Sequence, residues 1–358
     1  MFYLAIDQHR KQLTVNLRNE HGDVLIKRQV STRWEPVRKF FAEIRDLARP
    51  DGGFTAIVEV CGFNDWLLEM LRQFECRETV LIQAERRSKR KTDRRDADAL
   101  GELLWVNRHR LLGGQKPHHL RRVILPSRES RENRQLAALR RRLGQCRTQT
   151  INKVRHLLRK HNLDQECPTK GIDTKAARRW LASIALDEID RLEMNLLLAQ
   201  WQLFNEQLAR VEEKLSERHR CSKDAKLLST IPGAGIFNSI GLTASIGDIH
   251  RFPTPQSLPN YWGIVPGCRN SGEATDRLGS ITKQGSSMAR FILGQMVMHV
   301  LRRDARMRDW YRRIKHRRGS KIARVAVMRR LAMIIWHMLK HERPYVLNGL
   351  PPVREPSV

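Results

Sequence analysis

Residues 2–30 read FYLAIDQHRKQLTVNLRNEHGDVLIKRQV, and this stretch decides the fold expected for the first part of the chain. Residues 2–7 form an apolar run that ends at an acid, and residues 12–19 alternate apolar and polar side chains, which is typical of a strand. A turn cluster follows at 19–23, and residues 24–30 have the composition of another strand. The stretch predicts two hairpin-linked strands and a third, antiparallel strand.

The next segments add helices to these strands. Apolar spacing and length predict helix, strand, helix and strand in turn over residues 35–49, 54–60, 64–74 and 79–83. Asn64 or Asp65 is expected to cap the second of these helices. Another helix begins near Thr92 or Asp93 and continues to about residue 107. The predicted order is β-β-β-α-β-α-β-α.

The middle of the chain has a different rhythm. Residues 134–158 and 189–215 carry apolar side chains at steps of three and four, with Pro168 and Gly171 between them. The repeating positions are Leu136, Leu139, Leu143, Cys146, Thr150, Val154 and Leu157, then Leu192, Leu196, Ala199, Leu203, Leu208, Val211 and Leu215. This pattern predicts a coiled-coil hairpin or oligomerisation arm, with an ordinary helical bundle as the alternative.

From about Lys226 the composition changes again. Residues 231–236 (IPGAGI) form a Gly-rich turn, a loop runs through Arg277, and residues 308–318 are strongly basic. Helices are expected over residues 237–246, 287–302 and 322–341. The fold class is therefore α+β and multidomain: an α/β domain (1–125), a helical arm (126–225), a mostly α-helical domain (226–345) and a tail (346–358).

Charge and cysteine content narrow the class of protein. Lys and Arg number 67 against 38 Asp and Glu, a formal net charge of +29, which favours nucleic acid as partner over a ribosomal-type or membrane-surface role. No apolar run is long enough for a membrane span, residues 2–7 lack the basic leader of a signal peptide, and the six cysteines form no C-x-x-C pair. We expect a protein of the reducing cytoplasm with neither a disulfide framework nor a zinc site.

Four acids are the leading candidates for chemistry. Asp7 and Glu59 each end an apolar strand, where an acid costs burial energy unless a positive group holds it. Asp93 and Asp96 are three residues apart and share a helix face, whereas Asp98 lies on another side. Carboxylates that converge from these places could bind two Mg²⁺ ions, which would hold the attacking and leaving oxygens of a phosphodiester. The alternative for Asp93 is a simple N-cap.

Two segments are expected to contact nucleic acid. Residues 86–91 (RRSKRK) would meet phosphates beside the acids, with a solvated charged loop as the alternative. Residues 232–235 (PGAG) fit a helix-hairpin-helix turn whose N–H groups bind phosphate, with a plain Gly-rich turn as the alternative. The candidate residues are Arg86, Arg87, Lys89, Arg90, Lys91, Gly233 and Gly235.

Six motifs carry a resemblance to a known family. They are AID (5–7), VEVCG (58–62), KTDRRDADAL (91–100), TIPGAGIFNSIGLTASIGDIHRF (230–252), YWGIVPGCRNSG (261–272) and GSITKQGSSMAR (279–290). In this order, around a helical arm, they resemble the DEDD transposases of bacterial insertion sequences, the insertion-sequence 110 family. The resemblance runs from the N-terminus to about residue 305.

The resemblance implies an RNase H-like (RuvC-like) domain and a C-terminal transposase domain with a serine nucleophile. The implied catalytic ligands of Mg²⁺ or Mn²⁺ are Asp7, Glu59, Asp93 and Asp96. Ser271 matches the nucleophile best, and a phosphoserine link to the cut DNA strand would follow. Other serines nearby are Ser280, Ser286 and Ser287. The expected phosphate or scissile-site contacts are Arg269, Arg277, Lys283 and Arg290.

The resemblance also implies partners. Such a recombinase moves its element between donor and target DNA, guided by a structured bridge RNA from the element, as a dimer or tetramer in the bacterial cytoplasm near the nucleoid. Two alternatives stay open. One is a metal-dependent RuvC-like nuclease or junction resolvase with a helix-hairpin-helix module, and the other is a non-enzymatic nucleic-acid-binding protein.

Overall fold

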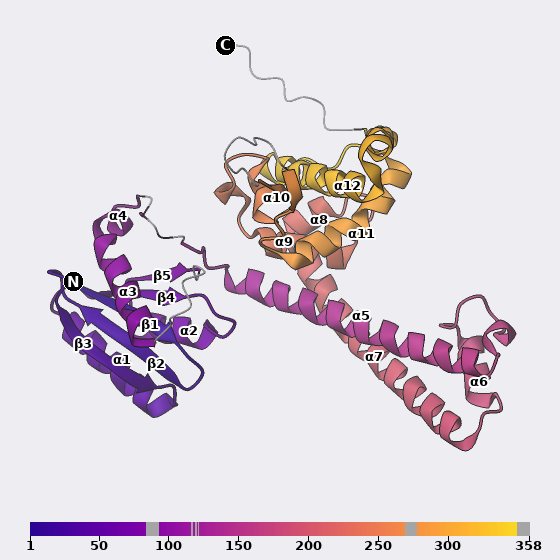
Figure 1. Ribbon diagram of the computed structural model, residues 1–358, viewed down its shortest axis with the longest axis horizontal. Coiled ribbons are helices and arrows are strands. Elements are labelled where there is room, and N and C mark those ends of the chain that lie inside the picture. Colours follow the sequence, from indigo (N-terminus) through magenta and orange to yellow (C-terminus); the bar gives the residue numbers. More distant parts are fainter. Residues whose placement is uncertain (84–92, 116, 119, 121, 269–277, 349–358) are drawn as a thin grey trace, which may run out of the picture. The chain divides into compact units, whose positions relative to one another are not determined.

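The computed structural model describes residues 1–83, 93–115, 117–118, 120, 122–268 and 278–348. The chain divides into two compact units, Met1–Leu125 and Pro126–Val358 (Figure 1). Among the described residues, no helix combines the length and the apolar character that a membrane crossing requires.

The first unit is built on a five-stranded sheet with the strand order β3-β2-β1-β4-β5. β2 pairs antiparallel with β1 and β3, and β4 pairs parallel with β1 and β5. The strands are β1 (Phe2–Gln8), β2 (Gln12–Arg18), β3 (Val24–Ser31), β4 (Phe54–Glu59) and β5 (Glu78–Ile82). Residues 2–30 thus form three antiparallel strands, as the sequence predicts.

Helices cover both faces of this sheet because successive side chains of a strand point to opposite sides. Leu4 and Ile6 join the core under α1 and α2, whereas Tyr3 and Ala5 join the core under α3. The helices are α1 (Trp34–Ala48), α2 (Asp65–Gln73), α3 (Asp93–Val106) and α4 (Arg108–Leu112). The predicted order β-β-β-α-β-α-β-α is confirmed, with boundaries displaced by a few residues and the short α4 added.

Two long helices form an arm in the second unit. α5 (Arg128–Lys160) and α7 (Glu188–Cys221) pack against each other, and α6 (Lys175–Ser183) lies at the tip beside the 3₁₀ turn Asp164–Glu166 (Figure 1). The core of the tip comprises Val154, Leu157, Leu158, Ile172, Leu181, Met194, Leu197 and Trp201. The predicted helical hairpin is confirmed, whereas α6 was not predicted.

The apolar seam predicted for α7 is wrong over its first half. Leu192, Leu196 and Leu203 have exposed fractions of 55%, 56% and 48%, while Met194 and Trp201 are almost fully buried, at 0% and 1%. The first half of α7 carries apolar side chains on two faces. The face that carries Met194 and Trp201 packs into the core of the tip. The second half follows the prediction. Its buried positions are Leu208, Val211 and Leu215.

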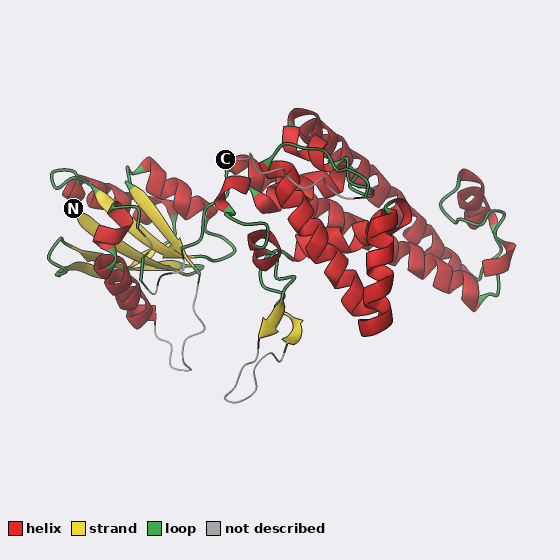
Figure 2. Cartoon of the chain, turned by 90° about the horizontal axis from the view of Figure 1, so that it is seen from above, coloured by secondary structure: helices red, strands yellow, loops and turns green. Residues whose placement is uncertain are grey.

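The rest of the second unit is helical apart from one two-stranded sheet, which stands out in Figure 2. Its elements are α8 (Lys223–Leu228), α9 (Ile236–Ile246), the 3₁₀ turn Ile249–Arg251, α10 (Ser257–Tyr261), β6 (Pro266–Cys268), β7 (Leu278–Ile281), α11 (Ser287–Arg303) and α12 (Ala305–Lys340). The loop expected through Arg277 is therefore flanked by paired strands. Gly319 interrupts α12 at φ +82°, so the basic and amphipathic stretches are two helical segments.

The root of the arm joins this helical cluster. Both α5 and α7 contact α9, and Phe237 and Ile240 of α9 pack with Leu208 and Leu215 of α7. The division predicted near residue 225 stays a prediction.

Candidate active site

Strand register places two of the predicted acids side by side. β1 and β4 run parallel, and Ile6 is matched with Val58. Asp7 and Glu59 are the next residues of the two strands, so both lie at the same edge of the sheet. Both continue the set of side chains that faces α3, and Asp7 is buried, with an exposed fraction of 8%.

The packing of α3 directs its first turns toward this edge. Arg18, matched with Tyr3, donates to Glu102 at 2.6 Å, and Asn16, matched with Ala5, donates to Asp98 at 2.8 Å. Glu102 therefore lies at the level of Tyr3, and Asp98, one turn earlier in α3, lies at the level of Ala5. The next turn toward the start of α3 lies at the level of Asp7.

Asp96 lies in the next turn of α3, four residues before the buried Leu100, on the helix face that packs on the sheet. Asp93 begins the helix, and its side chain lies outside the described residues. Register and helix direction therefore bring three predicted acids, Asp7, Glu59 and Asp96, toward one edge.

Asp98 has a structural role. Its Oδ1 accepts from Asn16 at 2.8 Å and its Oδ2 from Lys27 at 2.5 Å. Burial raises the pKa of Asp98, but the hydrogen bonds from Lys27 and Asn16 outweigh burial and leave the pKa below its ordinary value. This carboxylate fastens α3 to β2 and β3.

An amide clamp that the sequence did not reveal joins the two strand ends. Asn64 donates through Nδ2 to Gln8 Oε1 at 2.7 Å and to the carbonyl of Glu59 at 3.1 Å, and its Oδ1 accepts from the Cys61 N–H at 2.5 Å. The side chain therefore does not cap α2, which corrects the capping prediction. His9, also missed, places Nε2 3.0 Å from Asp7 Oδ2.

The donor set at this edge suits hard cations. Asp7, Glu59 and Asp96 offer carboxylate oxygens from three elements, and Mg²⁺ and Mn²⁺ prefer oxygen ligands. A nearly buried carboxylate such as Asp7 also requires positive charge beside it. The carboxylate chemistry of these three residues suits the predicted ions, and their role as metal ligands stays a prediction.

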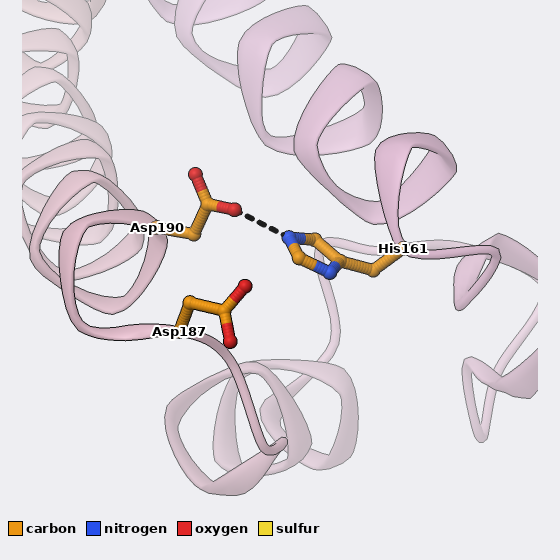
Figure 3. Close-up of side chains that lie close together, drawn as sticks. All are labelled: His161, Asp187 and Asp190. Carbon is orange, nitrogen blue, oxygen red and sulfur yellow. Dashed lines mark hydrogen bonds and ion pairs between the residues drawn. The ribbon is translucent and has the colours of Figure 1, made fainter.

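Among the described residues, the one group of three possible metal ligands with ligand atoms within 4.8 Å of one another lies at the arm tip and comprises His161, Asp187 and Asp190 (Figure 3). Lys160 already donates to both oxygens of Asp190, at 2.8 and 2.6 Å, and His161 Nε2 lies 2.6 Å from Oδ2. The hydrogen bonds from Lys160 and His161 lower the pKa of Asp190. Since Lys160 occupies both oxygens, the group joins α5 to α7.

Several predicted residues lie outside the described part of the chain. They are Arg86, Arg87, Lys89, Arg90, Lys91, Ser271, Arg269 and Arg277. Among the neighbouring serines, Ser280 is exposed on β7, Ser286 caps α11 by accepting from the Ala289 N–H at 3.1 Å, and Ser287 is the first residue of α11.

The base of the β6–β7 hairpin is closely packed. A Cβ on Gly263 would lie 2.2 Å from the Gln284 carbonyl oxygen, and a Cβ on Gly285 would lie 1.9 Å from that of Tyr261. Both glycines also have positive φ, so no other residue fits these two backbone segments. The exposed Lys283 shares this turn, at φ +55°.

Arg290 holds the same turn from α11. Its Nη1 donates to the carbonyls of Trp262, Gln284 and Gly285 at 2.8, 3.1 and 3.3 Å. This predicted phosphate contact is engaged within the chain and has a positioning role there.

The predicted helix-hairpin-helix turn lies between α8 and α9. Gly233 has φ +87°, and a Cβ there would lie 2.6 Å from His299 Cβ. Gly235 is the N-cap of α9, which has no side-chain cap, so the first N–H groups lack intrahelical acceptors. The geometry is compatible with anion binding at this helix end.

An α/β domain with acids at the ends of its central strands, followed by a strongly basic helical unit, defines a nucleic-acid-processing protein. A family model for IS110-type DEDD transposases matches residues 4–163, and one for the IS116/IS110/IS902 transposase family matches residues 225–312. Together they match more than half of the chain. The chain therefore belongs to the IS110 family of DEDD transposases, which are enzymes that process DNA.

Two curated relatives agree with this assignment. The chain is 29% identical to the "Transposase for insertion sequence element IS1111A" of Coxiella burnetii over 71% of this chain and 68% of that protein. It is 25% identical to the "Probable family 20 transposase" of Pseudomonas aeruginosa over 96% of this chain and 98% of that protein. The second match spans the arm as well as both units.

Proposed function

We propose that this transposase is a site-specific DNA recombinase whose N-terminal unit is an RNase H-like (RuvC-like) catalytic domain. The observation that carries the proposal is the register of β1 and β4, in which Asp7 and Glu59 directly follow the matched residues Ile6 and Val58 on the sheet face that α3 covers. Three antiparallel strands followed by two parallel ones, in the order β3-β2-β1-β4-β5, support the RNase H-like assignment.

The four acids would bind the metal ions, and the hydrogen bonds of Asn64 and His9 would position the acids. Asp7, Glu59, Asp93 and Asp96 are the proposed ligands of Mg²⁺ or Mn²⁺, which when bound would polarise the scissile phosphate. Asn64 keeps the Glu59 backbone and the Gln8 side chain together, and His9 orients the Asp7 carboxylate. Orienting groups of this kind fix ligands before substrate arrives.

Ser271 is the proposed nucleophile. Its Oγ would bond to phosphorus, the bond between phosphorus and one sugar oxygen would break, and the serine proton would end on the departing sugar hydroxyl. The DNA strand would then be joined to the protein as a phosphoserine ester, which conserves the energy needed for rejoining. The tightly packed glycines at residues 263 and 285 support this role, because they fix the base of β6 and β7, the two strands between which residue 271 falls in the sequence.

Donor and target DNA and a structured bridge RNA are the proposed partners. The formal charge of +29 and the exposed basic side chains of α12 support several nucleic-acid surfaces. We also propose a dimer or tetramer. The exposed apolar side chains of α7, namely Ile189, Leu192, Leu196 and Leu203, support self-association.

A denaturing gel tests the serine step. The full chain, an intact element end, its RNA and Mg²⁺ should give a DNA-linked protein band, and Ser271→Ala should remove it. Ser280→Ala is the matched control, since Ser280 is an exposed serine of the same hairpin. Cutting without any protein-linked band would instead identify a metal-dependent nuclease or junction resolvase.

A further inference from the structure

The root of the arm contains a cavity of about 600 Å³ between α5, α9 and the turn that precedes α11. Three arginines line it, Arg134, Arg141 and Arg142, and no acid lies among the described residues of its lining. The whole cavity lies within the second unit. Such a lining favours an anionic occupant.

The three arginines differ in what they bind already. Arg134 donates to the carbonyls of Ala244 and Ser245 at 2.7 and 3.3 Å, so it builds the wall of the cavity. Arg141 lies over the Phe291 ring at 4.3 Å, which fixes its guanidinium, and Arg142 is exposed.

Arg141 and Arg142 also differ from their neighbour on α5. Across the described parts of the chain, neither of them makes an ion pair, whereas Arg140 bonds to Glu212 at 2.8 Å. Two cationic side chains of α5 are therefore available to a ligand at the cavity.

The opposite wall adds backbone donors. α11 is a 17-residue helix whose first turn contains no acid, and its N-cap, Ser286, lines the cavity with Ser287 and Met288. The Ser286 hydroxyl accepts from the Ala289 N–H at 3.1 Å, so the N–H groups of Ser287 and Met288 lack intrahelical acceptors. The positive end of the helix dipole and the two available arginines thus line the same cavity.

We infer that this cavity binds a backbone phosphate of nucleic acid, between the guanidinium groups of Arg141 and Arg142 and the first turn of α11. Planar guanidinium groups and helix N-termini both recognise phosphate oxygens. The inference rests on the proposed function, because a recombinase brings DNA and RNA to this unit. DNA and RNA share this phosphate chemistry, and the experiment separates them.

The test measures binding of the full chain to fluorescent element-end duplex and, separately, to fluorescent element RNA, in EDTA and at several KCl concentrations. Arg141→Gln with Arg142→Gln should reduce the slope of log affinity against log salt by about 0.9 for each lost duplex contact, or about 0.7 for single-stranded RNA. Arg159→Gln removes the same charge from α5 outside the cavity and should leave the slope unchanged. Arg142→Gln alone provides the test if the double variant does not fold.

The change in salt dependence shows whether DNA or RNA supplies the phosphate. A smaller slope with only one of the two nucleic acids identifies that one as the ligand, and a smaller slope with both identifies a shared site. Unchanged slopes with both would overturn the inference. EDTA prevents metal-dependent cutting, so this result is independent of the covalent band. Absence of the DNA-linked protein band from the wild-type reaction would overturn the serine mechanism without affecting the cavity assignment.

Discussion

Two carboxylate clusters of this protein contain the same chemical groups in different surroundings. At the sheet edge, Asp7 accepts from His9 beside Glu59, and at the arm tip Asp190 accepts from His161 beside Asp187 (Figure 3). The tip cluster lies between two helix ends, and Lys160 bonds to both oxygens of Asp190. The edge cluster lies at the end of parallel strands, facing the helix that carries Asp96.

The difference shows that the proximity of acids is weak evidence for a metal site. At the tip, a lysine supplies the positive charge, so the cluster connects helices. At the edge, strand register and an amide clamp hold together the two strand ends that carry Asp7 and Glu59. We therefore expect the tip cluster to serve folding and the edge cluster to serve catalysis.

The largest effect is expected at Glu59. Glu59→Gln keeps the shape of the side chain and removes its charge, so cutting of an element end in Mg²⁺ should fall about 1,000-fold, the equivalent of several kcal/mol of transition-state stabilisation. The measurement is the single-turnover cutting rate. Asp98→Asn, which removes a structural acid, should cost stability while leaving the rate within about tenfold. Equal rate losses in both variants would show that charge alone matters.

A smaller effect is expected at the clamp. Asn64→Ala removes the hydrogen bonds to Gln8, the Glu59 carbonyl and the Cys61 N–H. The cutting rate should fall about 10–100-fold, as for residues that orient metal ligands. Titration with Mn²⁺ should show weaker apparent metal binding. A lower melting temperature with unchanged metal dependence would reduce Asn64 to a purely structural role.

Asp190 should affect stability without affecting chemistry. Asp190→Asn weakens the bonds from Lys160 and His161 that join α5 to α7, so the melting temperature should fall by about 2–4 °C. The cutting rate at 25 °C should not change. Calorimetry and the same single-turnover assay measure the two effects, and a large loss of cutting with intact folding would assign a catalytic role to the tip.

The smallest expected effect is the pH dependence of the stability that Asp190 contributes. Hydrogen bonds from Lys160 and His161 lower the pKa of Asp190 below 3.8, so its stabilisation is present above that pH and is lost as the pH falls through the lowered pKa. The hydrogen bond to Asp190 raises the pKa of Lys160 above 10.5, so that contribution is lost only as the pH rises beyond this value. The difference in melting temperature between wild type and Asp190→Asn should shrink as the pH falls below about 4.

The sequence predicts most of the sheet unit because its signals are local. The alternation in residues 12–18 and the apolar runs that end at Asp7 and Glu59 each identify a strand without reference to distant residues. The acids could be chosen because an acid at the end of an apolar run is unusual. The adjacency of the two strand ends depends on the parallel pairing of β1 with β4, which no local pattern in the sequence predicts.

The residues that were missed depend on distant partners. Asn64 resembles an N-cap in sequence, but Gln8, 56 residues away, draws its side chain elsewhere. The tip cluster was missed because it depends on the register between α5 and α7. Strand β6 was missed because residues 266–268 (PGC) lack the alternation of a strand. On α7, two apolar faces compete, and only packing decides which of them is buried.

The most direct test of the account compares one chemical change in both clusters. Asp7→Asn and Asp190→Asn each remove one carboxylate that accepts from a histidine. Element-end DNA, RNA and Mg²⁺ should give cut DNA and the protein-linked band with Asp190→Asn, and neither product with a folded Asp7→Asn. Cutting by Asp7→Asn at the wild-type rate, or loss of both products in a folded Asp190→Asn, would contradict the assignment of catalysis to the sheet edge.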